Sequence, residues 1–387
     1  MFKIEYSNGE INHGDYSRIK ECFDKADSGK EITVGFLGGS ITQGSLSSTP
    51  ETCYAYLVYD WFVKKFPNTK VNYINAGIGG TTSQYGVARV KKHLLEYKPD
   101  FILAEFAVND SNDSFFRETY EGLTRVILSD ENRPALLLMN NVRYDDCTSA
   151  EDMHLQVAKH YNVPMVSMKS TILPEVKGNI IPNREITPDD LHPNDEGHAL
   201  VANVITYELQ KIYDSKDELS EDKVLAASLS LNGYENSVMY QADNSNPVLE
   251  GFEADKREQN GILDIYKNGW IASNKGDKIT FEVEGTGVAV QYRKSVNQPA
   301  PIAEVIVDGI LSSKKMLNAN FDENWGDCLY IDTIVKHVNP GKHKVEIIIT
   351  EAHADDKVPF YLVSVIGSDG KSGEDALAGG SNLYIDN

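Results

Sequence analysis

The first 215 residues alternate short apolar runs with stretches of helical periodicity, and this alternation restricts the fold more than any other feature. Each run is bounded by Gly, Asn, Asp or Pro, as is typical of buried parallel strands. We predict strands at residues 32–37, 71–76, 101–108, 135–139 and 164–168. We predict helices at residues 54–62, 87–95, 118–129, 151–161 and 195–212. Such strand–helix alternation predicts a doubly wound α/β sandwich with a parallel sheet.

Beyond residue 215 the helical spacing gives way to a two-residue alternation. A polar, charged stretch at 213–222 is predicted to be a linker. Alternating runs follow, with Asp-Gly and Asn-Pro-Gly turn signals among them, at 279–284, 288–292, 303–309 and 344–349. Many short strands with such turns predict an antiparallel β-sandwich of the jelly-roll kind. We therefore expect two domains, at 1–215 and 223–387, as a length of 387 residues also favours.

The charge of the chain excludes several classes of partner. The 58 acidic residues outnumber the 37 Lys and Arg residues, which gives a net charge of −21. Such a field repels a phosphate backbone or an anionic bilayer, so neither nucleic acid nor membrane is expected as a partner. A neutral oligosaccharide does not experience this repulsion.

The expected location is the cytoplasm. The four cysteines are widely spaced and form no CxxC pair, which argues against a disulfide framework or a zinc knuckle. The N-terminal segment carries charges where a signal peptide requires an apolar core. No run of about 18 apolar residues occurs, so no membrane span is predicted.

The first predicted strand runs into Gly38-Gly39-Ser40-Ile41-Thr42, at the strand end where sites of open α/β sheets form. Backbone N–H groups at the start of the next helical segment favour negative charge, so Ser40 is well placed as a nucleophile whose attack creates an oxyanion. The same residues also fit a plain glycine turn in which Ser40 caps the helix. A phosphate loop would need Lys where Ser45 stands, and Thr42 replaces the second Gly of an α/β-hydrolase elbow.

The next two predicted strands also end in polar motifs. Gly79 and Gly80 precede a helical pattern and offer a backbone N–H to an oxyanion. Asn109, followed by Asp110, carries an amide that can donate to the same oxyanion. Taken singly, each motif also fits an ordinary turn.

The α/β half ends with a further motif, Asp189-Asp190-Leu191-His192. An Asp three residues before a His, on a turn, can reach back and orient the imidazole. Asp189 and Asp190 compete for this part on the residues alone, and the motif also fits a metal site or a surface turn. His198 follows, but no HExxH or Cys/His cluster accompanies it, so no metal is expected.

Together, and in this order, the four motifs resemble the SGNH (GDSL-like) hydrolase superfamily. The family pattern is a Ser block after the first strand, a Gly block after the second, an Asn block after the third and a C-terminal Asp-x-x-His. The resemblance covers about residues 30–210 and implies a three-layer, flavodoxin-like α/β/α domain. The usual Gly-Asp-Ser-Leu reads Gly-Gly-Ser-Ile here, which weakens assignments to lipases.

The resemblance implies a role for each motif. Ser40 is the implied nucleophile, His192 its general base and Asp189 the residue that orients His192, since the family spacing favours Asp189. Gly80 and Asn109 are implied to join the Ser40 backbone N–H in an oxyanion hole. No cofactor is implied for this chemistry.

The superfamily contains lipases, thioesterases, deacetylases and carbohydrate esterases, so the fold alone does not settle the substrate. The β-sandwich looks like a carbohydrate-binding module, and Trp325 lies in an aromatic, polar stretch at 321–327 that suits sugar stacking. A core tryptophan is the alternative. We expect this domain to help form the substrate site, with Trp325 as its contact.

The two-part arrangement resembles acetyl esterases that act on hemicellulose oligosaccharides, mannan among them. The expected substrate is therefore an acetylated oligosaccharide derived from mannan or xylan. Two alternatives stay open: a general short-chain acyl esterase or thioesterase whose β domain is structural, and a catalytically silent sugar-binding protein.

Overall fold

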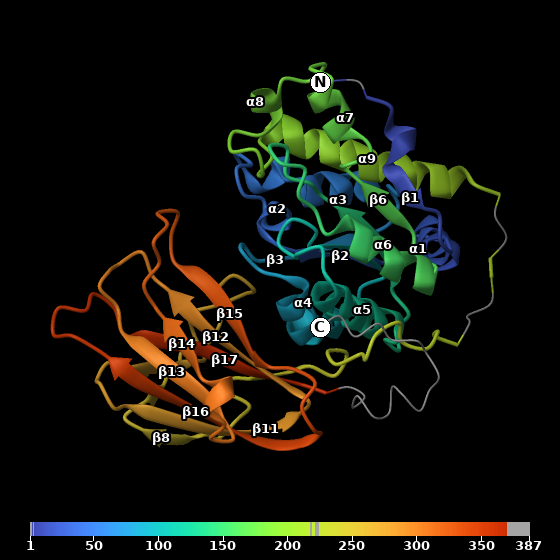
Figure 1. Cartoon of the computed structure of the whole chain (residues 1–387). Helices are drawn as coiled ribbons and strands as arrows, with labels where there is room; N and C mark the ends of the chain where they lie inside the picture. The colour runs from blue at the N-terminus through green and yellow to red at the C-terminus, as the bar shows by residue number, and fades with distance from the viewer. Residues whose placement is uncertain (1, 3, 217–218, 221–223, 370–387) are drawn as a thin grey trace. The chain divides into compact units, whose positions relative to one another are not determined.

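The computed structural model describes residues 2, 4–216, 219–220 and 224–369 (Figure 1). The chain forms two compact units that divide between Leu229 and Ser230. The predicted linker at 213–222 falls partly on residues 217–218 and 221–222, which lie outside the described residues, as does the end of the predicted second domain at 370–387.

The first unit is built on one six-stranded sheet. Its strands are β1 (Glu10–Asn12), β2 (Ile32–Gly38), β3 (Val71–Gly77), β4 (Phe101–Glu105), β5 (Ala135–Asn140) and β6 (Met165–Ser167). Their order is β1-β6-β5-β4-β2-β3, and all neighbours pair in parallel except β1, which runs antiparallel to β6 at the edge. The five parallel strands have the flavodoxin-like order, in agreement with the domain that the family resemblance implies.

Helices form a layer on each side of this sheet. They are α1 (Ser17–Asp27), α2 (Ser40–Gln43), α3 (Tyr54–Lys65), α4 (Ser83–His93), α5 (Ser114–Leu128), α6 (Glu151–Tyr161), α7 (Ile172–Lys177), α8 (Asn183–Ile186) and α9 (Asp195–Asp214). One layer contains α1, α3 and α9, which pack against one another, and the other contains α4, α5 and α6 (Figure 1). The predicted doubly wound α/β architecture is therefore confirmed.

The strand β4 is shorter than predicted, and this difference shapes the site. The predicted strand at 101–108 ends at Glu105. The carbonyl of Phe106 accepts the backbone N–H groups of Asn109 at 3.0 Å and Asp110 at 2.9 Å, so the chain turns immediately after β4. The turn, rather than a strand, carries Asn109.

The second unit consists of two antiparallel sheets, as predicted. Its strands are β7 (Val238–Tyr240), β8 (Val248–Glu250), β9 (Glu253–Ala254), β10 (Trp270–Ala272), β11 (Lys278–Gly285), β12 (Gly287–Lys294), β13 (Ile302–Val307), β14 (Lys315–Asn318), β15 (Cys328–Val335), β16 (Gly341–Glu351) and β17 (Phe360–Ser368). One sheet has the order β15-β12-β17-β10-β9 with β7 on β17, and the other has the order β14-β13-β16-β11-β8.

The alternating runs place their apolar side chains in the core between these sheets. In β11, Ile279, Phe281 and Val283 are buried while the residues between them are less buried, as a period of two requires. The same core contains Trp270, which is 1% exposed. The second unit is therefore a β-sandwich with its own hydrophobic core.

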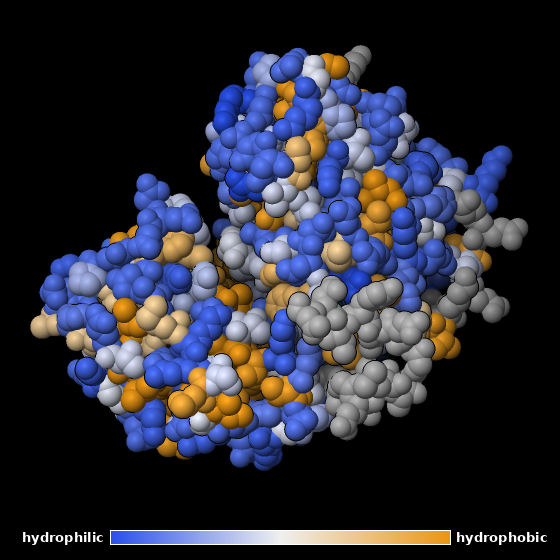
Figure 2. Space-filling model, viewed as in Figure 1, coloured by the Kyte–Doolittle hydropathy of each residue, from blue (hydrophilic) through white to orange (hydrophobic). Residues whose placement is uncertain are grey.

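Hydrophilic side chains cover most of the face of each unit that Figure 2 shows. None of the helices in the described ranges combines the length and the hydrophobicity that a membrane span needs.

Candidate active site

The predicted motifs meet at one edge of the parallel sheet. Gly38, at the end of β2, is opposite Gly77 of β3 on one side and Glu105 of β4 on the other. The segments that follow these strands therefore begin side by side. Ser40 follows β2 after a single residue, Gly39, as the first residue of α2, and is 9% exposed.

Three side chains from two distant segments of the chain form a continuous hydrogen-bonded row. The Nε2 atom of His192 lies 2.8 Å from the Oγ atom of Ser40, and its Nδ1 atom lies 2.6 Å from an oxygen of Asp189. A carboxylate next to Nδ1 keeps the proton on that nitrogen, which leaves the Nε2 lone pair facing the hydroxyl. The row thus has the geometry by which a base accepts a proton from a serine.

The turn from 189 to 192 is held by its own backbone. The other oxygen of Asp189 accepts the backbone N–H of His192 at 2.7 Å and that of Leu191 at 3.1 Å. Partial burial raises the pKa of Asp189, but hydrogen bonds from the His192 ring and from these backbone groups lower it more, so its pKa lies below the usual value. Asp189 is therefore a carboxylate at neutral pH.

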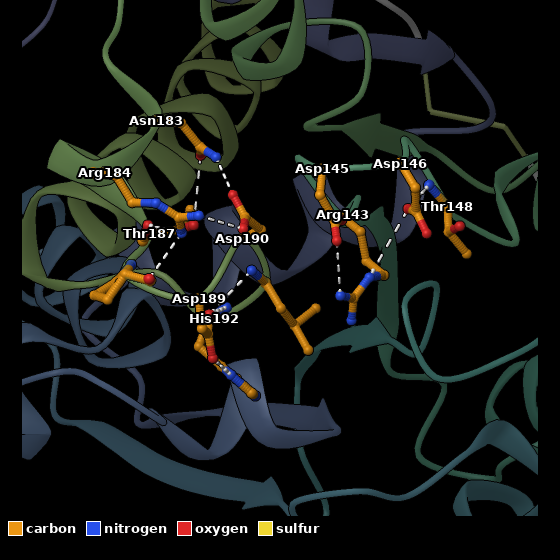
Figure 3. Close-up of polar contacts among 12 residues, drawn as sticks. Arg143, Asp145, Asp146, Thr148, Asn183, Arg184, Thr187, Asp189, Asp190 and His192 are labelled. Carbon is orange, nitrogen blue, oxygen red and sulfur yellow. Dashed lines mark hydrogen bonds and ion pairs between the residues drawn. The ribbon is translucent and has the colours of Figure 1, made fainter.

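Asp190 has a different set of partners. Its carboxylate accepts hydrogen bonds from Arg184 at 2.6 Å and from Asn183, while Asp189 lies beside His192 (Figure 3). Its carbonyl accepts the backbone N–H of Tyr144 at 2.8 Å. Asp190 has a φ of +65°, in the left-handed region that Asp tolerates better than most residues. The structure thus brings Asp189, and not Asp190, to His192.

The glycine motif runs beside Ser40. A Cβ atom at Gly79 would lie 3.7 Å from the Cβ of Ser40. The backbone N–H of Gly79 donates to Oε1 of Gln43 at 2.6 Å, so this N–H already has a hydrogen-bond acceptor within the protein. Gly80 follows with a φ of +68°, which favours glycine at this position.

Asn109 lies against the residue before Ser40. A Cβ atom at Gly39 would lie only 2.5 Å from Oδ1 of Asn109, so no larger residue fits at position 39 without displacing this amide. Ser40, as the first residue of a helix, has no intrahelical acceptor for its own N–H. Gly79, next to the predicted donor Gly80, and Asn109 therefore both lie close to the segment that carries Ser40.

Comparison with known proteins identifies the family. Residues 36–200 match the GDSL-like lipase/acylhydrolase family. Two crystal structures of a two-domain esterase active on acetylated mannans, one co-crystallised with mannopentaose, are 54% identical to this chain, with TM-scores of 0.92 and 0.93. Each comparison covers 96% of this chain and 100% of the esterase. The chain belongs to the GDSL-like hydrolases.

Curated relatives of this GDSL-like hydrolase agree with the family. Thioesterase 1/protease 1/lysophospholipase L1 of Escherichia coli strain K12 is 28% identical over 189 residues, which is 46% of this chain and 84% of the relative. The arylesterase of Vibrio mimicus is 27% identical over 151 residues, which is 36% of this chain and 71% of the relative. The protein is a carboxylic ester hydrolase.

The alternative of a metal site finds no support at His198. Its Nδ1 accepts the backbone N–H of Tyr54 at 3.3 Å, and its Nε2 lies 3.3 Å from the carbonyl of Ser45. Burial lowers the pKa of His198 to about 4, so the ring is neutral and holds the segment after Ser40. No group of three or more His, Cys, Asp or Glu residues suited to a metal occurs within the described part of this hydrolase.

A buried cation that was not predicted from the sequence lies next to the Ser40 segment of this hydrolase. Arg89 of α4 is fully buried and donates to the carbonyls of Gly38 at 3.0 Å and Ala76 at 2.7 Å. Burial lowers its pKa to about 10, so it stays charged at neutral pH. It connects the ends of the two strands that carry the serine and glycine motifs. Its acceptors are backbone carbonyls, so the sequence carries no signal of this contact.

Trp325 belongs to the β-sandwich unit. It is 55% exposed, so the alternative of a core tryptophan is wrong, and Trp270 occupies the core instead. The indole N–H donates to Glu323, and the ring of Phe321 meets it edge-on with centroids 5.0 Å apart.

Replacing Asn109 with alanine should lower kcat for p-nitrophenyl acetate by about 10²- to 10³-fold, which is the usual effect of losing one oxyanion donor. KM should change little, because such a donor acts mainly on the transition state. Steady-state kinetics on the folded variant test this. A change confined to KM would instead make Asn109 a substrate-binding residue.

Proposed function

We propose that this protein is a serine esterase that removes acetyl groups from carbohydrates. Ser40 is the proposed nucleophile, His192 the general base and Asp189 the residue that orients it. The observation that carries the proposal is the continuous row of hydrogen bonds, of 2.6 and 2.8 Å, from Asp189 through His192 to Ser40.

The proposed reaction follows from this row. As Oγ of Ser40 attacks the ester carbonyl, its proton passes to Nε2 of His192, and the carbonyl oxygen becomes an oxyanion. The N–H groups of Ser40 and Gly80 and the amide of Asn109 donate hydrogen bonds to that oxyanion. His192 then returns the proton to the departing sugar hydroxyl, which leaves an acetyl-serine. Water repeats the sequence, releases acetate and restores Ser40.

The proposed substrate is an acetylated oligosaccharide of the mannan type. It is supported by the 54% identical esterase, which is active on acetylated mannans and was co-crystallised with mannopentaose. The negative net charge of this chain is compatible with such a substrate, because a neutral sugar is not repelled by it. The test is a panel of acetylated mannan, xylan and pectin oligosaccharides together with an acyl thioester, followed by mass spectrometry. We expect the fastest loss of acetyl groups from the mannan oligosaccharides. Preference for the thioester would instead favour a general short-chain acyl esterase or thioesterase.

We further propose that the β-sandwich acts as a carbohydrate-binding module in which Trp325 stacks on a sugar ring. Its exposed indole among polar neighbours supports this role. Trp325→Ala should raise KM for acetylated mannan oligosaccharides by about 10-fold, because the loss of one aromatic anchor residue typically weakens binding by about this factor. Hydrolysis of p-nitrophenyl acetate should stay nearly unchanged, because this small ester needs no sugar platform.

The matched control for this variant is Tyr330→Ala, which removes another exposed aromatic ring of the same unit. It should leave both activities close to those of the unmodified protein. If Trp325→Ala instead lost activity equally on both substrates and had a lowered melting temperature, the role of Trp325 would be structural.

A further inference from the structure

A second His–Asp pair lies behind the proposed oxyanion donors, and the reaction as described does not use it. Nε2 of His154 lies 3.1 Å from Oδ2 of Asp110, and neither side chain is exposed to solvent. Buried polar groups of this kind are costly unless every hydrogen-bonding atom finds a partner. The hydrogen bonds of the two residues therefore indicate which segments of the chain the pair holds together.

The carboxylate of Asp110 connects the two segments that carry the donors. Asp110 directly follows Asn109, and its backbone N–H is tied to the carbonyl of Phe106 at 2.9 Å. Its Oδ1 accepts the backbone N–H of Ser83 at 2.9 Å, at the first residue of α4 and three residues after Gly80. One carboxylate thus fixes the start of the helix behind the glycine motif relative to the turn that bears Asn109.

His154 keeps that carboxylate in place from a third element. Its Nδ1 lies 3.1 Å from Oδ1 of Asn140 at the end of β5, so each ring nitrogen faces a side-chain oxygen. The ring of Tyr120 stacks on it at 3.6 Å between centroids and 5° between planes. The stacked ring and these two contacts restrain the imidazole, and both oxygens of Asp110 are bonded, one to His154 and one to the Ser83 N–H.

The helix of His154 also holds the Asn109 turn through its backbone. The N–H of Ala150, which caps α6, donates to the carbonyl of Ala107 at 2.7 Å. His154 lies one helical turn further on, since its N–H donates to the carbonyl of Ala150 at 3.0 Å. The helix α6 thus reaches the turn after β4 at two points, one through the backbone and one through the His154–Asp110 pair.

We propose that Asp110 and His154 are positioning residues that set the geometry of the oxyanion hole. The inference rests on the proposed function, because it assigns the pair an effect on the rate through Asn109. Oxyanion donors stabilise the transition state only when they are held in place before the reaction, and a misplacement of about 1 Å can cost about 10²-fold in rate. The pair touches neither substrate nor reacting atoms, so it acts on the rate through the donors alone.

The test variant is His154→Phe, which keeps an aromatic ring against Tyr120 but removes both hydrogen bonds. We expect kcat for p-nitrophenyl acetate to fall by about 10-fold and KM to stay within about twofold, because displaced donors weaken binding of the transition state more than that of the substrate. His154→Gln, which can still donate to Asp110, should recover part of the loss. An unchanged kcat in His154→Phe would overturn the proposal.

A double-mutant cycle separates positioning from a general loss of structure. In the Asn109→Ala background the donor that His154 helps to place is already gone, so His154→Phe should lower kcat by less than about threefold further. Equal losses from His154→Phe in both backgrounds would show that it does not act through Asn109. If His154→Phe does not fold, Asp110→Asn serves in the same cycle, because it keeps an oxygen for the Ser83 N–H.

The β-sandwich supplies a matched control. His343 is also buried and lies 2.7 Å from a carboxylate oxygen of Asp308, but it belongs to the other unit. His343→Phe should lower the melting temperature without changing kcat for p-nitrophenyl acetate. These outcomes also separate the two proposals. If Asn109→Ala itself leaves kcat unchanged, the proposed oxyanion hole is wrong. If the losses from Asn109→Ala and His154→Phe are additive, only the proposed role of His154 is wrong.

Discussion

Replacing Ser40 with alanine should lower kcat for p-nitrophenyl acetate by about 10⁴-fold or more, while the protein stays folded. The loss is large because no acetyl-serine can form, and only the binding and oxyanion contributions stay. His192→Ala should cost a similar factor. Because the two residues act as one unit, Ser40→Ala/His192→Ala should lose little more than either single variant. Initial rates with matched melting temperatures measure this.

Ser45→Ala is the control for this result, since Ser45 lies on the same segment and its side chain has no part in the proposed reaction. It should keep near-full activity. Near-full activity in a folded Ser40→Ala variant would mean that Ser40 is not the nucleophile.

The second large effect is expected at the acid of the row. Asp189→Asn should lower kcat by about 10⁴-fold, because an amide in place of the carboxylate no longer holds His192 in the tautomer that accepts the proton of Ser40. Its carboxylate accepts three hydrogen bonds from residues 191 and 192, so the variant also loses the charge that fixes the turn. Kinetics at neutral pH, where Asp189 is ionised, are the relevant measurement.

Asp190→Asn provides the matched comparison, one residue away. Its side chain bonds to Arg184 and Asn183 rather than to His192, so we expect a loss of less than about 10-fold, through looser positioning of the turn. A loss at Asp190 as large as that at Asp189 would mean that the acid of the row has been assigned to the wrong residue.

The strands that build the site could be predicted because they are buried on both faces and end in glycine or polar residues. The predicted strand at 101–108 was too long because Phe106, Ala107 and Val108 are as apolar as the strand itself. Only the hydrogen bonds to the carbonyl of Phe106 show that the chain turns there.

Among the elements that were not predicted, α1 and β17 were missed for opposite reasons. In α1, Ile19, Cys22, Phe23 and Ala26 are buried at helical spacing, but charged residues separate them and hide the pattern. In β17 every residue from Phe360 to Ser368 is buried, so the two-residue alternation that revealed its neighbours is absent. Tertiary burial, rather than local pattern, determines this strand.

The residues of the proposed catalytic row could be found because each lies in a recognisable motif at a strand end or turn. The buried residues that hold the surrounding segments in place could not be found in this way. Asp110 and His154 are 44 residues apart, and a histidine on α6 looks like any exposed helix residue until α6 is packed against the sheet. Arg89 is equally ordinary in sequence, because its acceptors are backbone carbonyls, which leave no mark on the residue types.

The most direct measurement is to quench the enzyme during turnover of an acetylated mannan oligosaccharide and to map acetylated residues by peptide mass spectrometry. We predict one acetyl group on the peptide that contains Ser40, located at Ser40, and none there in Ser40→Ala. A serine esterase mechanism at this site would be contradicted by an acetyl group on a different residue, if replacing that residue abolished both the acetyl group and the activity. Full turnover by Ser40→Ala would contradict it as well.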